Sequence, residues 1–164
     1  MKPSYMEIEK AISETNENIA ELKENIKPNI AKGIAEAVVT NSGTNKIIKL
    51  SEEILIGNKL SFTTDGGIKI GQGVHHVKVS GNIRVKSNVN NTRAVIQLNK
   101  NQDNAFVSNT IYCSTAGTEY GGAAAETLIS VEAGNVIYLS YYNSESTVVT
   151  LNATLSSMTV EVVN

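Results

Sequence analysis

Few residues in this sequence have the types and spacing that enzyme chemistry requires. His75 and His76 are the only histidines, and adjacent residues of a strand point to opposite faces, so one chain does not easily present both to one metal ion. Three copies of either histidine could converge on zinc or an anion near a threefold axis, although an ordinary structural histidine is the simpler interpretation. Cys113 has no base nearby in the sequence and is best explained as a small buried apolar residue.

Other catalytic patterns are also missing from the sequence. It contains no Gly-x-Ser-x-Gly nucleophile motif, and Asp65 and Asp103 are the only aspartates, too few for a calcium loop of the EF-hand type. Gly71-Gln72-Gly73 lacks the third glycine of a nucleotide-binding loop. We therefore expect a protein that is not an enzyme and that uses no cofactor and no metal ion.

Tyrosines beside amides are the better candidates for binding. Tyr120 falls in the long loop 115–122, and Tyr142 and Asn143 end a predicted strand. An exposed tyrosine next to hydrogen-bonding side chains suits contact with a saccharide or a protein surface, so these three residues are predicted as a weak ligand site. Packing roles for the tyrosines, or binding through the asparagine-rich loops 88–91 and 101–104, are the alternatives.

Composition limits the partners that this chain can have. The chain has 164 residues, of which 18% are charged and 5% are aromatic, with a net charge of −2 and no dense stripe of Lys and Arg. Nucleic acid is therefore not expected as a partner. The sequence has neither an apolar export signal at its start nor an apolar run of membrane-spanning length, so we expect no membrane partner and no export.

The first part of the chain, residues 1–39, has the period of a helix. Together with Thr15, its apolar residues are spaced alternately three and four apart, as in the a and d positions of a coiled coil. The spacing predicts a helix over 5–27 that associates with identical helices, through Tyr5, Ile8, Ile12, Ile19, Leu22 and Ile26. Packing of this helix on its own domain is the alternative. A second short helix is predicted over 28–37, with a linker at 40–44.

From residue 45 to residue 164 the period changes to two, which predicts a head domain made of strands. Glycine- and asparagine-rich turns separate the strands, and no helix is expected between them, which indicates a β-sandwich or barrel. The predicted strands are 45–50, 53–56, 59–63, 67–70, 75–86, 93–99, 109–114, 126–131, 135–142, 147–152 and 155–163.

One predicted strand, 135–142, carries apolar bulk on both faces. One face can line the core of the sandwich, and the other needs a second cover, which a neighbouring subunit would supply. We accordingly predict a subunit interface at Ile137, Leu139 and Tyr141.

The order of these strands resembles a known family of heads. The resemblance is carried by Gly57-Asn58-Lys59-Leu60-Ser61-Phe62, by residues 65–70 and 73–81, and by the closing segments 126–139 and 153–163. They resemble the jelly-roll heads of tumour necrosis factor and of the complement globular-head family, which bacteriophage virion proteins also use. The resemblance implies a jelly-roll β-sandwich head that forms a trimer. Together with the predicted helix, we expect a mainly β homotrimer with an N-terminal coiled-coil stem.

The expected function follows from this layout. A short helical stem and a small head rich in Asn, Ser and Thr look like a bacteriophage head fibre or a baseplate or tail-tip protein located in the virion. The stem would join other virion proteins, and the head would project to a host-surface glycan or protein. The alternatives are a secreted or cell-surface recognition protein of complement type, a capsid decoration protein without receptor binding, and a glycan-degrading tail protein.

Overall fold

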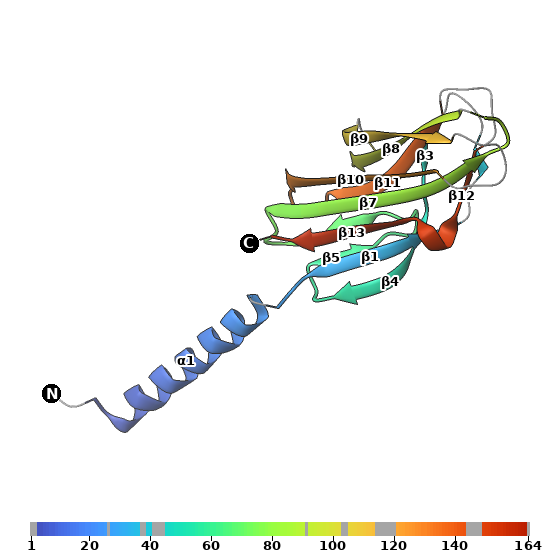
Figure 1. Cartoon of the computed structure of the whole chain (residues 1–164). Helices are drawn as coiled ribbons and strands as arrows, with labels where there is room; N and C mark the ends of the chain where they lie inside the picture. Colours follow the sequence, from blue (N-terminus) through green and yellow to red (C-terminus); the bar gives the residue numbers. More distant parts are fainter. Residues whose placement is uncertain are drawn as a thin grey trace.

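The computed structural model consists of one helix followed by a two-sheet β-sandwich (Figure 1). It describes residues 3–25, 27–36, 39–40, 45–90, 92–102, 105–113, 121–143 and 149–163. The C-terminal end of the helix lies beside the sandwich, near the C-terminus of the chain, and the rest of the helix extends away from the sandwich (Figure 1). The described part of the chain contains no helix that is both long and apolar enough to cross a membrane.

The helix α1 (Tyr5–Asn25) confirms the predicted stem helix, and a capping box begins it. The backbone N–H of Ser4 donates to Glu7 Oε2 at 2.6 Å, and the backbone N–H of Glu7 donates to Ser4 Oγ at 3.3 Å. Both hydrogen bonds satisfy amide groups that the first turn of a helix leaves unpaired. Hydrogen bonds to its carboxylate from the Ser4 backbone N–H and, second, from the Ser4 side chain lower the pKa of the Glu7 carboxyl, which keeps a negative charge at the positive end of the helix.

The second predicted helix, over 28–37, is wrong, because residues 30–35 form the strand β1 (Ile30–Ala35). Its side chains alternate between half-buried and buried, with Ala31, Gly33 and Ala35 directed to the core. A Cβ at Gly33 would lie 2.8 Å from Leu50 Cβ, so only glycine permits this close approach. Because β1 pairs with strands of the sandwich, the head begins before the predicted boundary at residue 45.

The sheet that contains β1 is named here the β7 sheet, after its longest strand. Its order is β2-β12-β7-β13-β1-β4, and β10 also pairs with β7. All these pairings are antiparallel. The remaining members are β2 (Val39–Thr40), β4 (Leu50–Ile56), β7 (His76–Ser87), β10 (Gly121–Ser130), β12 (Val149–Leu151) and β13 (Ser157–Val162).

The second sheet is named the β11 sheet and has the order β5-β6-β11-β8-β9, with β3 also pairing with β11. Its strands are β3 (Asn45–Ile47), β5 (Leu60–Phe62), β6 (Ile68–Ile70), β8 (Thr92–Lys100), β9 (Ala105–Cys113) and β11 (Val136–Asn143). A single 3-10 turn, η1 (Ala153–Leu155), precedes β13. The two-sheet sandwich predicted from the period of two is thereby confirmed, although Gly121 and Gly122 lie inside β10 and not in a turn.

The core lies between the two sheets and decides the role of β11. Ile137, Leu139 and Tyr141 are 0% exposed and belong to the central apolar cluster. The prediction that these three residues form a subunit interface is therefore wrong, because their side chains are already enclosed within one chain.

The opposite face of β11 is also covered without a second subunit. Tyr138 is buried there, and its hydroxyl donates to Asp65 Oδ2 at 2.8 Å. A Cβ at Gly67 would lie 2.7 Å from Tyr138 Cε1, which shows that the turn between β5 and β6 folds directly onto the ring. Further along, Ser140 Oγ donates to Asn99 Oδ1 at 2.6 Å. Local turns and polar side chains thus cover this face, which was expected to need a neighbouring subunit.

Candidate assembly and binding surfaces

The apolar stripe of α1 has no partner within the described part of the chain. Its exposed fractions range from 43% at Ile19 to 76% at Tyr5, and every described side chain of the helix is exposed. Because the helix stands clear of the sandwich, this stripe does not pack on its own head (Figure 1). We name it the stem stripe, and it comprises Tyr5, Ile8, Ile12, Ile19 and Leu22. The sixth predicted residue, Ile26, lies outside the described residues.

Thr15 lies between the residues of the stem stripe, and its polar side chain can be buried against a second helix. Thr15 occupies the d position between Ile8 and Leu22, and its hydroxyl donates to the carbonyl oxygen of Ala11 at 2.7 Å. The hydroxyl hydrogen is therefore already satisfied within the helix, so burial of Thr15 against a second helix would leave no donor unpaired. A shallow groove of about 360 Å³ runs along this stretch beside Ile8 and Ile12.

Asn29 fixes the point at which the stem enters the head. Its buried side chain accepts hydrogen bonds from the backbone N–H groups of Asn58 and Lys59, both at 3.1 Å, and donates to the carbonyl oxygen of Lys27 at 3.1 Å. Its own carbonyl oxygen accepts from the N–H of Val162 at 2.9 Å. Gly57 has φ +81°, and a Cβ there would clash with Asn29 Oδ1. One side chain thus joins the stem connection to the turn between β4 and β5.

We expect Asn29→Ala to lower the free energy of unfolding of the head by about 1–3 kcal/mol, because two backbone N–H groups lose their acceptor. Chemical denaturation of the full chain measures this loss. Asn58→Ala is the matched control, since the Asn58 side chain is exposed and only its backbone contacts Asn29. Equal stability of the two variants would contradict the role assigned to Asn29.

The solvent-facing side of the β7 sheet is a second candidate surface, named here the β7 face. Its middle is polar, and two lysines there are each paired with a glutamate. Lys78 Nζ lies 3.1 Å from Glu126 Oε1, and Lys32 Nζ lies 2.7 Å from Glu53 Oε2. Because these charges are already matched, a partner that covers the middle of the face needs no net charge of its own.

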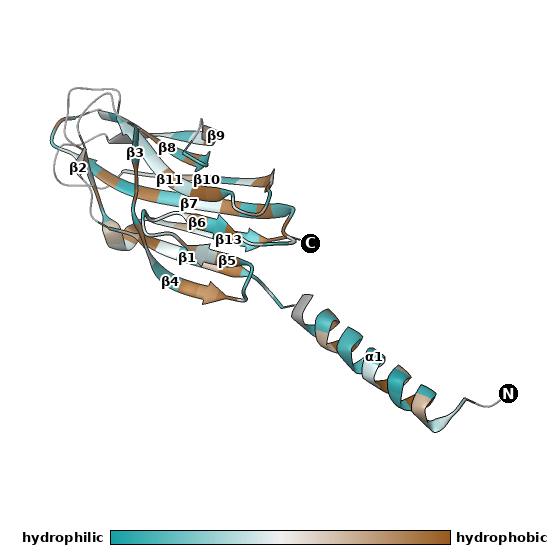
Figure 2. Ribbon diagram, turned by 180° about the vertical axis from the view of Figure 1, so that it is seen from behind, coloured by the Kyte–Doolittle hydropathy of each residue, from teal (hydrophilic) through white to brown (hydrophobic). Residues whose placement is uncertain are grey.

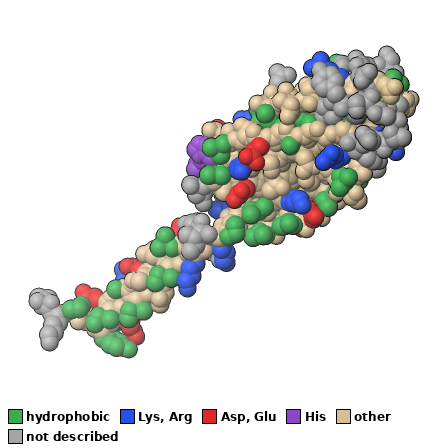
Figure 3. All heavy atoms as spheres, in the orientation of Figure 1, with side chains coloured by type: hydrophobic (Ala, Val, Ile, Leu, Met, Phe, Trp, Pro, Cys, Tyr) green, Lys and Arg blue, Asp and Glu red, His purple; other side chains and the backbone are tan. Residues whose placement is uncertain are grey.

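Apolar side chains lie at the two margins of the β7 face. On β10, Leu128 is 58% exposed, and on the edge strand β4, Ile54 and Ile56 are also exposed. Figure 2 shows the C-terminal end of β4 as hydrophobic, and Figure 3 shows hydrophobic side chains gathered along the margin of the head over β4. An exposed edge strand with apolar side chains is a surface that proteins normally cover.

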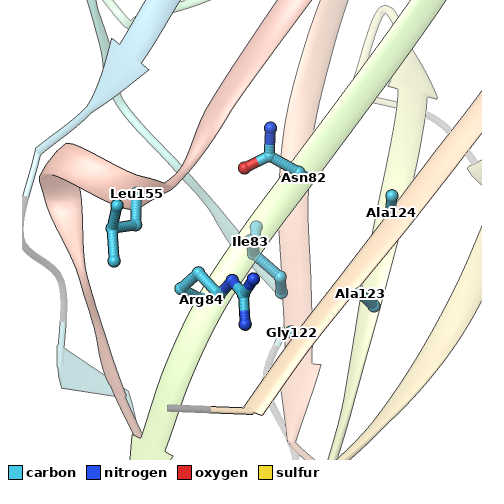
Figure 4. Close-up of a pocket in the computed structure, with 7 residues that line it drawn as sticks. All are labelled: Asn82, Ile83, Arg84, Gly122, Ala123, Ala124 and Leu155. Atoms are coloured by element: carbon cyan, nitrogen blue, oxygen red, sulfur yellow. The ribbon is translucent and has the colours of Figure 1, made fainter.

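A depression of about 470 Å³ lies near the end of the β7 face that is remote from the stem (Figure 4). Arg84 of β7 and Leu155 of η1 border it, together with Asn82, Gly122 and Ala124. The Arg84 side chain lies across Gly122, where a Cβ would come within 2.9 Å of Nε and 3.0 Å of Cζ. Because Gly122 has no side chain, the guanidinium group can lie close against β10.

Unlike Lys32 and Lys78, Arg84 has no ion pair with any described residue. A guanidinium group held in one place can bind a carboxylate through two parallel hydrogen bonds, and the exposed Leu155 offers an apolar contact across the depression. The arrangement suits non-covalent binding of a carboxylate-bearing ligand.

The two predicted ligand residues that the structure describes do not form an exposed site. Tyr142 is half-buried, whereas Asn143 is fully buried and cannot contact an external ligand. Tyr120 lies outside the described residues. The sequence contains Arg84 and Gly122, but their contact joins two distant strands, and no local motif reports it.

Asp65 belongs to a network that holds turns together. Its carboxylate accepts hydrogen bonds from the hydroxyls of Thr63 and Tyr138 and from Gln102 Nε2. The bonds from Thr63 and Tyr138 lower the pKa of the Asp65 carboxyl, so it stays ionised at neutral pH, while burial raises the pKa of Tyr138. Each polar atom has a structural partner, so we assign this cluster to stability.

Neither histidine gains a partner for metal binding within the described residues. His75 and His76 are both exposed, and no group of three or more His, Cys, Asp or Glu side chains in the described part of the chain could hold a metal ion. The backbone of Cys113 ends β9, and its side chain is not described.

Comparison with solved structures places the sandwich among known folds. The structure of Eiger TNF from S. frugiperda matches with a TM-score of 0.58 at 10% sequence identity, over 84% of this chain and 94% of that one. Murine APRIL at pH 5.0 matches with a TM-score of 0.59 at 6% identity, over 84% of this chain and all of that one. The head is a TNF-like jelly roll. At these identities the likeness concerns the fold alone.

A second structure of murine APRIL, at pH 8.5, gives the same result, with a TM-score of 0.60 at 8% identity, 84% coverage of this chain and 100% of that one. Searches by sequence give no further assignment. No protein-family model matches the chain. No curated protein matches it either.

Proposed function

We propose that this chain is a non-enzymatic, homotrimeric structural protein of a bacteriophage virion, either a head fibre or a baseplate or tail-tip component. In this proposal three copies of α1 form a parallel coiled coil whose N-terminal end joins other virion proteins. The heads project outward and contact the host surface. The stem stripe is the observation that carries the proposal, because an apolar stripe exposed along a 21-residue helix needs partner helices.

The layout of the head supports an outward-facing role. The stem leaves the sandwich on the side where β1 begins and the chain ends, so the Arg84 depression lies toward the opposite end of the head (Figures 1 and 4). The chain joins a small TNF-like head to a projecting helix. This layout suits a spike that is attached to a particle. Three heads on one stem would strengthen weak single contacts through avidity.

Removal of the stem tests the docking half of the proposal. A chain that begins at Lys27 keeps Asn29 and β1, and we expect it to form a folded head that is no longer incorporated into particles. The full chain is the control for incorporation. Normal incorporation of the shortened chain would contradict the assigned role of the stem.

Arg84→Ala tests the proposal that the head contacts the host surface. We expect saturable binding of the purified protein to host cells to weaken roughly 10- to 150-fold, because the loss of a charge-assisted hydrogen bond costs about 1.5–3 kcal/mol. Arg93→Ala is the matched control, since Arg93 is an exposed arginine on β8 of the other sheet. Equal binding by both variants would exclude Arg84 from the contact, whereas no saturable binding by the unmodified chain would favour a decoration protein without receptor binding.

The alternative function is a secreted or cell-surface recognition protein of complement type. The likeness of the head to Eiger TNF and to murine APRIL is the observation that favours it. The genes beside the coding sequence separate the two proposals. Capsid, portal or tail genes support a virion protein, whereas their absence supports the recognition protein.

A further inference from the structure

The fold uses the backbone of Arg84 and leaves its side chain available. The backbone N–H donates to Ser156 Oγ at 2.9 Å, and the carbonyl oxygen accepts from the N–H of Asn152 at 2.7 Å. These two bonds tie β7 to the segment around η1. The guanidinium group, in contrast, donates no hydrogen bond to a described residue and forms no ion pair with one. Its N–H groups are therefore free to bind a ligand.

Asn82 adds a hydrogen-bond acceptor beside these donors. It lies two residues before Arg84 on β7, so both side chains project from the same face of the strand (Figure 4). Asn82 Nδ2 donates to Ser157 Oγ at 3.0 Å, and Asn82 Oδ1 accepts no hydrogen bond from a described residue. Free donors and a free acceptor thus border one depression, and Arg84 is the one charged side chain among its described lining residues.

Small and apolar side chains complete the lining of the depression. Gly122 and Ala124 of β10 leave room beside Arg84, and the exposed Leu155 borders the depression from η1 (Figure 4). The C–H groups of a sugar ring can pack against such apolar atoms while its hydroxyls form hydrogen bonds with polar side chains. An acidic sugar also carries a carboxylate, which a guanidinium group binds through two parallel hydrogen bonds.

A peptide fits this depression less well than a sugar. Extended peptides that bind to a sheet form backbone hydrogen bonds with a free strand edge. At Arg84, however, β7 has neighbours on both sides, because it pairs with Gly122 of β10 and is bonded to Asn152 and Ser156. A sugar needs no backbone partner, since the side chains supply both donors and an acceptor.

We infer that the depression binds an acidic saccharide, with the carboxylate on Arg84 and a ring hydroxyl that donates to Asn82 Oδ1. The inference rests on the proposed contact of the head with the host surface and names the chemical class of its ligand. The stem lies toward the other end of the head, so association of the stems leaves the depression uncovered (Figure 1). A polymer with repeated acidic sugars would engage several heads at once.

Two sugars that differ only at the acidic group test the class of ligand. We expect the full chain to bind methyl β-D-glucuronide at least roughly tenfold more tightly than methyl β-D-glucoside, which has a hydroxymethyl group in place of the carboxylate. Ligand-observed NMR titrations measure both dissociation constants. Equal affinity for the two sugars, or no binding of the glucuronide, would overturn the inference. Tighter binding of N-acetyl-trialanine, a peptide with a free carboxylate, would also overturn it and would indicate a protein ligand.

Variants of the chain test where the glucuronide binds. Arg84→Lys keeps the positive charge but loses the paired N–H groups, so it should weaken binding about tenfold. Gly122→Ala should also weaken binding, because a Cβ there would lie 2.9 Å from Arg84 Nε and displace the guanidinium group. Arg93→Lys is the matched control on β8 of the other sheet and should leave binding unchanged. Equal affinity of Arg84→Lys and the unmodified chain would overturn the inference.

Host-cell binding separates this inference from the proposed function. If host cells bind the full chain saturably but methyl β-D-glucuronide neither binds nor competes, the host contact stands and the acidic-sugar ligand is wrong. If the glucuronide binds at Arg84 but host cells do not bind the chain, the sugar site stands and the host contact is wrong.

Discussion

Ile137→Glu should leave no folded head. Ile137 is fully enclosed between the sheets, so glutamate removes its packing and places an unpaired carboxylate in the core. We expect a loss of about 5 kcal/mol or more from a total stability of about 5–15 kcal/mol for a domain of this size. Circular dichroism and thermal unfolding of the full chain measure the effect.

The control for this substitution is Leu155→Glu, which adds the same charge at an exposed position on η1 and should leave the head folded. A soluble, folded, single-chain Ile137→Glu protein would contradict the packing described above. It would also restore Ile137 to a subunit interface.

Ile12→Asp with Ile19→Asp should abolish the stem without unfolding the head. Both residues belong to the stem stripe, and an isolated helix of this length is marginal in water without partner helices. We expect the helical signal in far-ultraviolet circular dichroism to fall nearly to that of the chain beginning at Lys27, while the head melts at nearly the wild-type temperature.

The matched control places the same two aspartates on the outer side of the helix, as Glu17→Asp with Glu21→Asp. These changes should keep most of the helix, because residues 17 and 21 lie outside the stem stripe. Loss of the head fold in the stripe variant would show that α1 packs on the sandwich. Full helicity of that variant at low protein concentration would show that α1 needs no partner.

Periodicity made the larger elements predictable from the sequence. Alternate spacing of three and four identified α1, and alternation by two identified most strands of the sandwich. The capping box of Ser4 and Glu7 is visible in the sequence as Ser-x-x-Glu before an apolar run, and it strengthens the start of the helix. These signals are local, so each is available from the residues of one segment.

Features that depend on distant contacts could not be predicted in this way. The alternation of side chains along the strand shows that β11 has two apolar faces. It does not show that the turn holding Asp65 covers Tyr138. The strand β1 cannot be told from a helix by its sequence, because helical spacing and strand alternation both fit its short run of small and apolar residues. Asn29 contacts a turn that lies 29 residues away in the sequence, and no local pattern reports that contact.

The boundary of the stem changes how the protein should be shortened. Deletion of residues 1–39 would remove β1 from between β13 and β4 and open the β7 sheet. Deletion up to residue 26 keeps that sheet and the Asn29 contacts intact. A failure of the longer deletion to fold would therefore say nothing about the stem.

The oligomeric state of the intact chain tests the central claim most directly. Native mass spectrometry or sedimentation equilibrium of the full chain at low micromolar concentration should give three times the mass of one chain. A single-chain mass under the same conditions would contradict the account, because the stem stripe and the margins of the β7 face would then remain exposed to water.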